Sequence, residues 1–402
     1  MKKLLFVINT LGTGGAEKAL IELLEKIDFS KYSVDFFVLL NQGELIHDVP
    51  ANVNILNGNY DDTPIYCPKG KKHLIKHVIL SLLKKGCFLQ FLGFFFQAFL
   101  KELHEKKDNK TILLWQPMAY SAPRFERDYD LAVAFHEGGS TYYVSKYVSA
   151  RKKVAFVHVD YEKAGYSRWL DREAYENIDR IYAVSNEVSN SFLKTYPEYT
   201  EKVKIFHNII NLDKIDRKSM EFSGYEDGFN GIRILTVGRL CAQKALEYSI
   251  DAMKILKIEG KNVRWYVLGR GYEEKRLKKL IITQGLGDVF FLLGNKANPY
   301  PYIAECDIYV HASKFEGKSI AVQEAQALSK PIIVSDCAGN REQVIHMYDG
   351  MMCELDSTKI AEAIMYMINN KDEAELMGKR AYERISSEFA NNNELENMLG
   401  MA

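Results

Sequence analysis

The chain has 402 residues, a length for which two domains are the natural expectation. Its 53 basic and 53 acidic side chains cancel to a formal net charge of zero, so we expect no nucleic-acid partner. The six cysteines form no C-x-x-C pair, which argues against a zinc site or a disulfide framework and favours reduced thiols in a cytoplasmic protein.

The first half of the chain alternates short apolar runs with helical patterns. Lys3–Ile8 predicts a first strand rather than a signal peptide, because no cleavage site follows it; a glycine-rich turn, Gly12–Gly15, then leads into a helix over 16–27. Later apolar runs predict strands at Val34–Leu40, Val53–Leu56, Ile112–Trp115, Leu131–Phe135, Lys153–His158 and Ile181–Ser185. Their spacing with the helices is typical of βαβ units and a mostly parallel sheet.

Asp128 and Asp130 form a D-x-D pattern, which can bind a divalent cation. The pattern immediately precedes a strand, and no third oxygen ligand is in view. Such sites need several oxygen ligands, so we predict no metal site here.

Residues 69–107 combine nine lysines and only two acidic residues with many large apolar side chains. The uninterrupted apolar part, Cys87–Leu100, is too short to span a bilayer, which takes about 20 residues. Two interpretations stay open. The segment forms amphipathic helices that lie on an anionic membrane surface, or it forms helices that pack on the first domain with their lysines in water.

The second half begins with a polar segment, 214–230, in which we place a hinge. The strand Ile232–Val237 then leads into Gly238, Arg239 and Lys244, a cationic corner that can grip phosphate oxygens. Two more predicted strands end in glycine turns: Val263–Leu268 is followed by Gly269 and Gly271, and Val289–Leu293 by Gly294 and Asn295.

The most informative stretch is 313–325. It follows the predicted strand Asp307–His311 and leads into a helix, so its backbone N–H groups and the helix dipole favour an anion. Ser319 is a candidate N-cap, Glu316 lies in the loop, and Glu324 lies near the start of the helix, where a carboxylate can accept hydrogen bonds from ribose hydroxyls. A strand at Pro331–Val334 and helices near 361–367 and 374–389 complete the pattern.

The spacing Glu316-x7-Glu324, together with Gly238-Arg239 and Lys244, resembles the signature of the family 4 retaining glycosyltransferases, or glycosyl transferases group 1. That family has the GT-B fold. The resemblance therefore implies an α/β protein with two doubly wound Rossmann-like domains facing each other across a cleft. Residues 1–212 would form the acceptor-side domain and 213–384 the donor-binding domain, with a last helix at about 385–402 packing back on the first.

The resemblance also implies roles for individual residues. Glu316 would lie against the donor sugar, His158 would orient the sugar from the first domain, and Arg239 and Lys244 would stabilise the leaving diphosphate. The implied donor-binding residues are Gly14, Gly15, Gly238, Arg239, Lys244, Gly269, Gly271, Gly294, Asn295, Glu316, Gly317, Lys318, Ser319 and Glu324. Tyr161, Lys163 and Arg168 are candidates for acceptor contacts. The chain departs from the family at Ala245, where glycine is usual.

The implied reaction transfers a sugar from a nucleoside-diphosphate donor, for which we expect UDP, to a hydroxyl of a saccharide or lipid-linked acceptor with retention of configuration. We expect no metal or other cofactor, and a place in bacterial surface polysaccharide or glycolipid assembly, at the inner face of the cell membrane if 69–107 binds lipid. Two alternatives are a sugar-nucleotide epimerase and a non-catalytic relative. The first would lack the spaced glutamate pair, and the second should have lost one of Arg239, Lys244, Glu316 and Glu324, all of which are present.

Overall fold

A computed structural model describes residues 1–65, 67–83, 89, 91–93, 96, 110–171, 173–390 and 393–402. The chain divides into two compact units. The first comprises Met1–Asn208 together with Asn393–Ala402, and the second comprises Ile209–Asn392. Each unit is built on its own parallel sheet, so the predicted pair of α/β units is confirmed.

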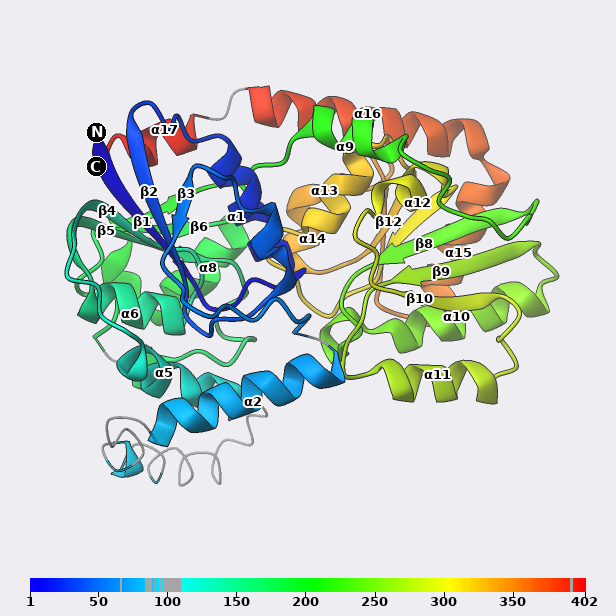
Figure 1. Ribbon diagram of the computed structural model, residues 1–402. Coiled ribbons are helices and arrows are strands. Elements are labelled where there is room, and N and C mark those ends of the chain that lie inside the picture. The colour runs from blue at the N-terminus through cyan, green and yellow to red at the C-terminus, as the bar shows by residue number, and fades with distance from the viewer. Residues whose placement is uncertain are drawn as a thin grey trace. The chain divides into compact units, whose positions relative to one another are not determined.

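The described part of the first unit contains a seven-stranded sheet in the order β3-β2-β1-β4-β5-β6-β7, with every neighbouring pair parallel (Figure 1). Residues Leu4–Ile8 of β1 are all fully buried, because a central parallel strand is covered on both faces. The strands are β1 (Lys2–Ile8), β2 (Tyr32–Val38), β3 (Val53–Ile55), β4 (Asp128–Ala134), β5 (Ser149–Val157), β6 (Arg180–Ala183) and β7 (Val203–Ile205).

The helices of the first unit follow the strands as crossovers. They are α1 (Gly15–Glu25), α2 (Pro68–Leu83), α5 (Trp115–Ser121), α6 (Gly139–Tyr147), α7 (Arg168–Asp171), α8 (Asn186–Thr195) and α17 (Glu394–Leu399), with 3-10 turns at Glu44–Asp48, Lys110–Leu114 and Pro197–Tyr199. Ser185 caps α8, since its side chain accepts a hydrogen bond from the Val188 N–H.

The predicted strand at Ile112–Trp115 is wrong. The segment is a 3-10 turn over Lys110–Leu114 that runs directly into α5. A run of four apolar residues does not separate a strand from a buried helical turn. Pro117 favours the helix, because it lies in the first turn of α5, where a missing N–H costs no hydrogen bond.

The C-terminal segment returns to the first unit at Asn393, so both chain termini lie side by side there (Figure 1). The Lys2 ammonium donates to the Ala402 carbonyl at 2.6 Å. The Glu394 carboxylate, at the start of α17, accepts from the His207 backbone N–H at 2.5 Å. These contacts fix the end of the chain against the strands β1 and β7.

The described part of the second unit contains a six-stranded parallel sheet in the order β10-β9-β8-β11-β12-β13. The strands are β8 (Ile232–Val237), β9 (Val263–Leu268), β10 (Phe290–Gly294), β11 (Ile308–His311), β12 (Ile332–Ser335) and β13 (Met351–Cys353). The helices are α9 (Leu212–Ser219), α10 (Leu246–Ile258), α11 (Glu274–Thr283), α12 (Tyr300–Glu305), α13 (Ile320–Ala327), α14 (Ala338–Gln343), α15 (Ser357–Asn369) and α16 (Lys371–Ala390), with a 3-10 turn, η5, at Ala242–Lys244.

Alternate residues of the second sheet face two separate cores. Ile234, Trp265 and Val310 pack with α10, α11 and α15, whereas Leu235 and Tyr309 pack on the opposite face with α12 and α13. The segment 214–230, in which we expected a hinge, begins inside helix α9, whose N-terminus is capped by Asn211.

Helix α2 presents apolar residues on two sides. Leu74, Val78 and Leu82 pack against the core of the first unit, while Ile75 and Leu83 are 59% and 70% exposed. Within the predicted segment 69–107, most of the part from 84 to 107 lies outside the described residues, including Lys84, Lys85, Lys101, Lys106 and Lys107. In the part of the chain that the structure describes, no helix is long and apolar enough to cross a bilayer.

Candidate functional site

In the second unit, the neighbouring strands β8 and β11 mark the point where the strand order reverses. Crossovers leave these two strands toward opposite edges of the sheet, so their carboxyl ends open a crevice, which is where ligands bind in doubly wound sheets. The exit of β8 carries Gly238, Arg239 and Lys244, and the exit of β11 carries 312–319. Topology therefore brings the predicted cationic corner next to the predicted glutamate loop.

Three side chains meet in this crevice. The Lys244 Nζ atom lies 2.6 Å from Glu316 Oε1, and both side chains are largely buried. His311, the last residue of β11, is 1% exposed and places its Nε2 atom 3.0 Å from Lys244 Nζ and 3.2 Å from Glu316 Oε1. Sequence reasoning missed His311. Its position at the carboxyl end of a buried strand was the available signal.

The pKa values of Glu316 and His311 depend on their burial and on the neighbouring charge of Lys244. Burial by itself would raise the pKa of Glu316, but the Lys244 charge and the hydrogen bond with His311 outweigh it and hold that pKa well below its usual range. Burial, and then the Lys244 charge, lower the pKa of His311. At neutral pH the arrangement is therefore a carboxylate and an ammonium beside a neutral imidazole.

Gln243 ties the two strand exits together through backbone groups. Its side-chain amide donates to the Phe315 carbonyl at 2.8 Å, and its own carbonyl accepts from the Lys314 N–H at 2.9 Å. Lys244 follows directly in the 3-10 turn η5. The distance between Lys244 and Glu316 is thus fixed by main-chain contacts and not only by their charges.

Ser319 is the N-cap residue of α13, as predicted, but its side chain makes no cap hydrogen bond. Its hydroxyl lies 3.2 Å from His311 Nε2 instead. Its backbone N–H, which we assigned to the diphosphate, donates to Gln343 Oε1 at 2.6 Å. The Lys318 side chain is also engaged, in an ion pair with Glu388 of α16.

The glycines at the ends of β9 and β10 are required by the packing and conformation of the backbone around them. A Cβ atom at Gly269 would lie 1.9 Å from the Gly238 carbonyl oxygen, and one at Gly271 would lie 2.1 Å from the Leu240 carbonyl oxygen. Gly269 and Gly294 also have φ values of 143° and 75°, which L side chains rarely adopt. The Gly269 N–H donates to the Gly294 carbonyl at 2.8 Å, so these turns form one continuous edge.

Gly238 differs from those glycines. A Cβ atom there would meet only the alkyl chain of Lys244, at an ordinary contact distance of 3.4 Å. Ala245 stands where the family usually has glycine, and its backbone is strained, because this fully buried residue has φ 45° and ψ 37°. Such a left-handed conformation costs an alanine roughly 1–2 kcal/mol, which explains why glycine suits the position.

Glu324 lies further along α13 and is 2% exposed. The Tyr300 hydroxyl, at the start of α12, donates to Glu324 Oε1 at 3.2 Å. Arg239 and Asn295 have exposed side chains at the exits of β8 and β10. Of the residues predicted in this unit, Lys244, Glu316 and Ser319 are brought together around His311, and the glycines line the adjoining strand exits.

His158 lies in the first unit, directly after β5. Its ring packs beside Phe135 and Phe156, and burial lowers its pKa to about 3, so the imidazole is neutral. Its Nε2 atom is buried and has no hydrogen-bond partner among the described residues. The His158 backbone N–H donates to Glu137 Oε2 at 3.1 Å.

Glu137 is a second residue that sequence reasoning missed. It follows β4 and is 1% exposed, and its backbone carbonyl accepts from the Asn9 side chain at 2.9 Å. Asn9 directly follows β1, and the turn after it continues to Gly14 and Gly15 at the start of α1. Gly14 has φ −80°, so the turn does not need a left-handed glycine at this position.

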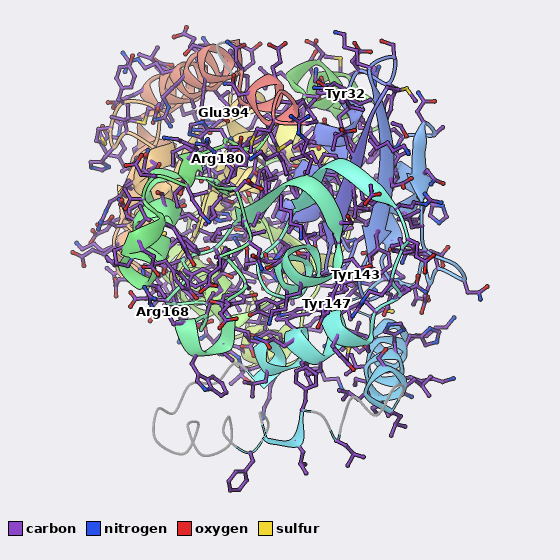
Figure 2. The ribbon with its side chains drawn as sticks, turned by 90° about the vertical axis from the view of Figure 1, so that its left-hand side faces the viewer. Tyr32, Tyr143, Tyr147, Arg168, Arg180 and Glu394 are labelled. Carbon is purple, nitrogen blue, oxygen red and sulfur yellow. The ribbon has the colours of Figure 1, made fainter. Side chains whose placement is uncertain are left out.

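The three candidate acceptor contacts differ in burial and in their partners. Tyr161 is fully buried and donates its hydroxyl proton to Asp171, so it belongs to the core. Arg168 donates to the Thr195 carbonyl at 2.8 Å and stacks 4.9 Å from the centre of the Tyr196 ring at the edge of the unit (Figure 2). Lys163 pairs with Asp160 at 2.9 Å and stays half exposed.

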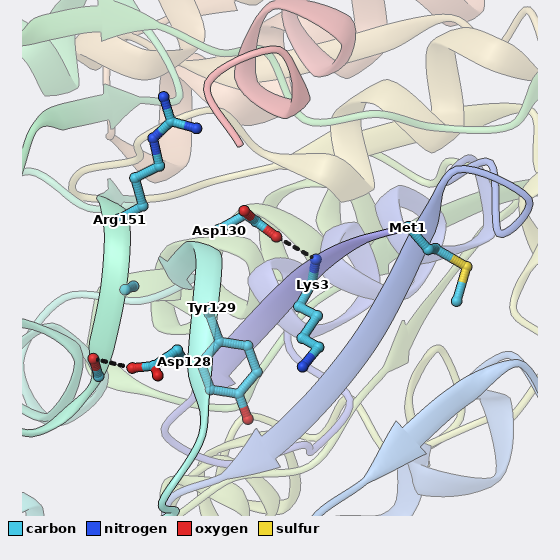
Figure 3. Close-up of a pocket in the computed structure, with 8 residues that line it drawn as sticks. Met1, Lys3, Asp128, Tyr129, Asp130 and Arg151 are labelled. Atoms are coloured by element: carbon cyan, nitrogen blue, oxygen red, sulfur yellow. Dashed lines mark hydrogen bonds between the residues drawn. The ribbon is translucent and has the colours of Figure 1, made fainter.

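The D-x-D pattern lies at the amino end of β4, on the edge opposite the strand exits. A pocket of about 400 Å³ opens there between Lys3, Asp128, Asp130 and Arg151 (Figure 3). Asp128 accepts from the Ser149 hydroxyl at 2.6 Å, and Asp130 accepts from the Lys3 backbone N–H at 2.8 Å. Both carboxylates thus accept hydrogen bonds from residues of the neighbouring strands. The described residues contain no cluster that could hold a metal ion.

Two parallel, doubly wound units, with a crevice at the switch point of the second, are the architecture of the GT-B fold. Residues 228–384 match the model of the family described as glycosyl transferases group 1. Over these residues the chain is similar to the glycosyl transferases group 1, in agreement with the resemblance found in its sequence.

Curated relatives and solved structures agree with this assignment. The chain is 27% identical over 361 residues, 89% of this chain and 87% of the relative, to the N-acetylgalactosamine-N,N'-diacetylbacillosaminyl-diphospho-undecaprenol 4-alpha-N-acetylgalactosaminyltransferase of Campylobacter jejuni. It is 28% identical over 231 residues, 54% of this chain and 60% of the relative, to the capsular polysaccharide biosynthesis glycosyltransferase CapM of Staphylococcus aureus. The structure of HepE from Anabaena in complex with UDP matches with a TM-score of 0.69 at 18% identity, covering 100% of both chains.

Proposed function

We propose that this protein transfers a sugar from a UDP-sugar to a hydroxyl of a saccharide or lipid-linked acceptor, with retention of anomeric configuration, in the assembly of a bacterial surface polysaccharide or glycolipid. The observation that carries the proposal is the buried Lys244–Glu316 pair at the switch point between β8 and β11. UDP is the nucleotide in the solved complexes of HepE from Anabaena and TarM from S. aureus, and the Campylobacter relative is named for a diphospho-undecaprenol-linked acceptor.

The proposed chemistry places positive charge where negative charge grows. As the sugar leaves, the diphosphate gains charge, and Arg239, Lys244 and the amides of Gly317 and Lys318 stabilise it. Glu316 orients the sugar and Glu324 binds the ribose hydroxyls. The buried carboxylate of Glu316 holds Lys244 in place, so the ammonium needs little rearrangement to meet a phosphate oxygen.

The remaining assignments follow the resemblance. His158 enters the proposal as a neutral hydrogen-bonding group for the sugar, since its lowered pKa excludes a cationic role at neutral pH. No described side chain is assigned as a covalent nucleophile. The leaving phosphate would accept the proton of the attacking hydroxyl on the same face of the sugar, which accounts for retention.

A nucleotide-release assay tests the proposal. Purified protein is incubated with a panel of UDP-, GDP- and ADP-sugars, with and without candidate saccharide and lipid-linked acceptors, and the freed nucleotide is measured. We expect UDP release that depends on one sugar nucleotide and increases with acceptor. Release from a GDP- or ADP-sugar alone would reject the choice of UDP, and failure to bind any sugar nucleotide by calorimetry would reject the function.

For residues 69–107 we propose contact with an anionic membrane surface. The support comes from the described part of the segment, because Lys71, Lys72 and Lys76 are exposed on the same helix as the outward apolar residues Ile75 and Leu83. Exposed apolar and basic side chains on one helix are typical of binding in the lipid interface. A protein held there would reach a lipid-linked acceptor directly.

A further inference from the structure

Gln343, the last residue of α14, makes two hydrogen bonds to the backbone of Ser319. Its Oε1 atom accepts from the Ser319 N–H at 2.6 Å, and its Nε2 atom donates to the Ser319 carbonyl at 2.9 Å. Gln343 is 2% exposed, and Ser319 is 8% exposed. A side-chain amide that matches both backbone groups of one residue fixes the position and the orientation of that peptide.

The same residue also holds the far end of α13. The Gln343 carbonyl accepts from the side-chain amide of Gln326 at 2.7 Å, in the last turn of that helix. Gln343 therefore contacts α13 at its N-cap and again near its C-terminus. Glu324 lies between these two contacts, and Glu316 lies three residues before the first of them.

Helix α14 is itself fixed to the sheet and to the glutamate loop. The side chain of Asn340, which is fully buried, donates to the Ser335 carbonyl at the end of β12, at 2.8 Å. A Cβ atom at Gly339 would lie 2.1 Å from the Gly317 carbonyl oxygen, so the two backbones are in direct contact there. The sheet thus supports α14, and α14 supports the segment from Glu316 to Ser319.

We propose that Gln343 is a positioning residue for the donor site, acting through the backbone of Ser319. Gln343 accepts from the N–H of the N-cap residue, as the N3 side chain of a capping box does, while the Ser319 hydroxyl makes no cap hydrogen bond and contacts His311. His311 in turn contacts Glu316 and Lys244. Gln343 is thereby linked to the Lys244–Glu316 pair without touching substrate.

This inference rests on the proposed function but has a test of its own. Gln343→Met keeps the volume of the side chain and removes both hydrogen bonds to Ser319. In that variant the Ser319 amide should exchange with solvent deuterium at least about tenfold faster than in the wild type, because its buried acceptor is lost. Unchanged exchange at Ser319 would overturn the proposed contact, whatever reaction the protein catalyses.

The kinetic test uses UDP binding and UDP release from the preferred sugar nucleotide. Gln343→Met should lower kcat by about tenfold or more, since small displacements of reacting groups are costly, while the Kd for UDP changes much less. Gln284→Leu is the matched control, because Gln284 makes a side-chain hydrogen bond to Asp251 away from the site. Equal kcat values in Gln343→Met and Gln284→Leu at matched loss of thermal stability would reduce Gln343 to a structural residue.

Gln343→Glu adds a pH signature that a purely structural role would not produce. A protonated carboxyl can accept from the Ser319 N–H and donate to its carbonyl, whereas a carboxylate can only accept. The ratio of variant to wild-type kcat should therefore rise as the pH falls. A ratio that stays constant with pH would contradict the proposal. If the wild type binds no sugar nucleotide, the proposed function is rejected, and the exchange experiment still tests the contact between Gln343 and Ser319.

Discussion

Lys244 Nζ lies 2.6 Å from Glu316 Oε1, and neither side chain is more than 12% exposed. Two opposite charges that are shielded from solvent attract each other strongly, but their removal from water costs a comparable free energy. Such a pair is weak evidence for a stabilising role, which makes it reasonable to look for a chemical one. The two contributions can be separated by experiment.

Lys244→Met should lower the free energy of unfolding by about 3–5 kcal/mol, because it leaves the Glu316 carboxylate buried without its partner. The double variant Lys244→Met with Glu316→Leu should recover most of that loss, since two apolar side chains replace the pair. UDP binding should stay weak in both variants, because a charge-assisted contact is worth about 1.5–3 kcal/mol. Urea unfolding and calorimetry check these outcomes, and a double variant that binds UDP like the wild type would remove Lys244 from the site.

Glu316 and Glu324 should separate in their kinetic effects. Glu316→Gln keeps the shape of the side chain and should reduce turnover more than UDP binding, because its proposed contact is to the sugar. Glu324→Ala should chiefly weaken UDP binding, because its proposed contact is to the ribose. Initial rates and UDP titrations measure both, and the reverse pattern would exchange the two assignments.

Asp171 should make the stability of the protein depend on pH. It is fully buried and accepts hydrogen bonds from Tyr142 at 2.6 Å and Tyr196 at 2.9 Å, and burial raises its pKa to about 6. Between pH 4 and 6 the folded state therefore holds a proton that the unfolded state releases. The free energy of unfolding should fall as the pH rises through this window, by up to about 3 kcal/mol from this group.

Asp171→Asn cannot lose that proton and should remove this contribution, so the difference between wild type and variant should change with pH in the same window. Asp128→Asn, at an exposed carboxylate of the same unit, is the control. Urea unfolding at pH 4.5, 5.5 and 7 gives the comparison. Parallel curves for wild type and Asp171→Asn would show that the carboxyl titrates normally.

Turnover should not require a divalent cation, because Arg239, Lys244 and the loop amides supply the charge that a metal would otherwise provide. Activity should persist in excess chelator, and Asp128→Ala with Asp130→Ala should leave kcat unchanged. Activity abolished by chelator and restored by manganese or magnesium would defeat this expectation. A loss in the double aspartate variant as well would return the D-x-D pattern to the site.

Binding to liposomes tests the proposed membrane contact of 69–107. Wild-type protein should co-sediment with vesicles that contain phosphatidylglycerol and much less with neutral vesicles, and high salt should weaken the binding. Changing Lys71, Lys72 and Lys76 of α2 to glutamate should abolish it. The same change at Lys275, Lys278 and Lys279, which are exposed on α11, is the matched control. Wild-type protein that stays in the supernatant with every vesicle would leave α2 as an ordinary surface helix.

Much of the architecture could be predicted from the sequence because its signals are local. The apolar runs at β1, β8 and β11 are each followed by a glycine-containing turn, and together these features predict where the strand lies and where it ends. The parallel order of the strands follows from the spacing of the helices between them. The error at Ile112–Trp115 shows the limit of such signals, since burial alone does not specify whether a short apolar run is extended or helical.

The roles of the supporting residues could not be predicted, even where a strand end marked the position, because these roles depend on contacts between distant segments. His311 looks like one more strand residue until the structure places its ring against Lys244, and Gln343 looks like a polar residue on a short helix. Neither is marked by spacing or charge. Glu137 is similar, because nothing in the sequence around it predicts that its carboxylate accepts a hydrogen bond from the His158 backbone N–H.

The steric contrast among the glycines bears on how the donor preference of this protein could be altered. At 269 and 271 the space for a side chain is already filled by backbone carbonyl groups, so that edge of the crevice is a surface of main chain and tolerates no variation. At 238 a methyl group would fit beside the Lys244 alkyl chain. Laboratory evolution toward another sugar nucleotide would therefore do best to keep 269 and 271 fixed and to randomise 238 with the exposed positions Arg270 and Asn295.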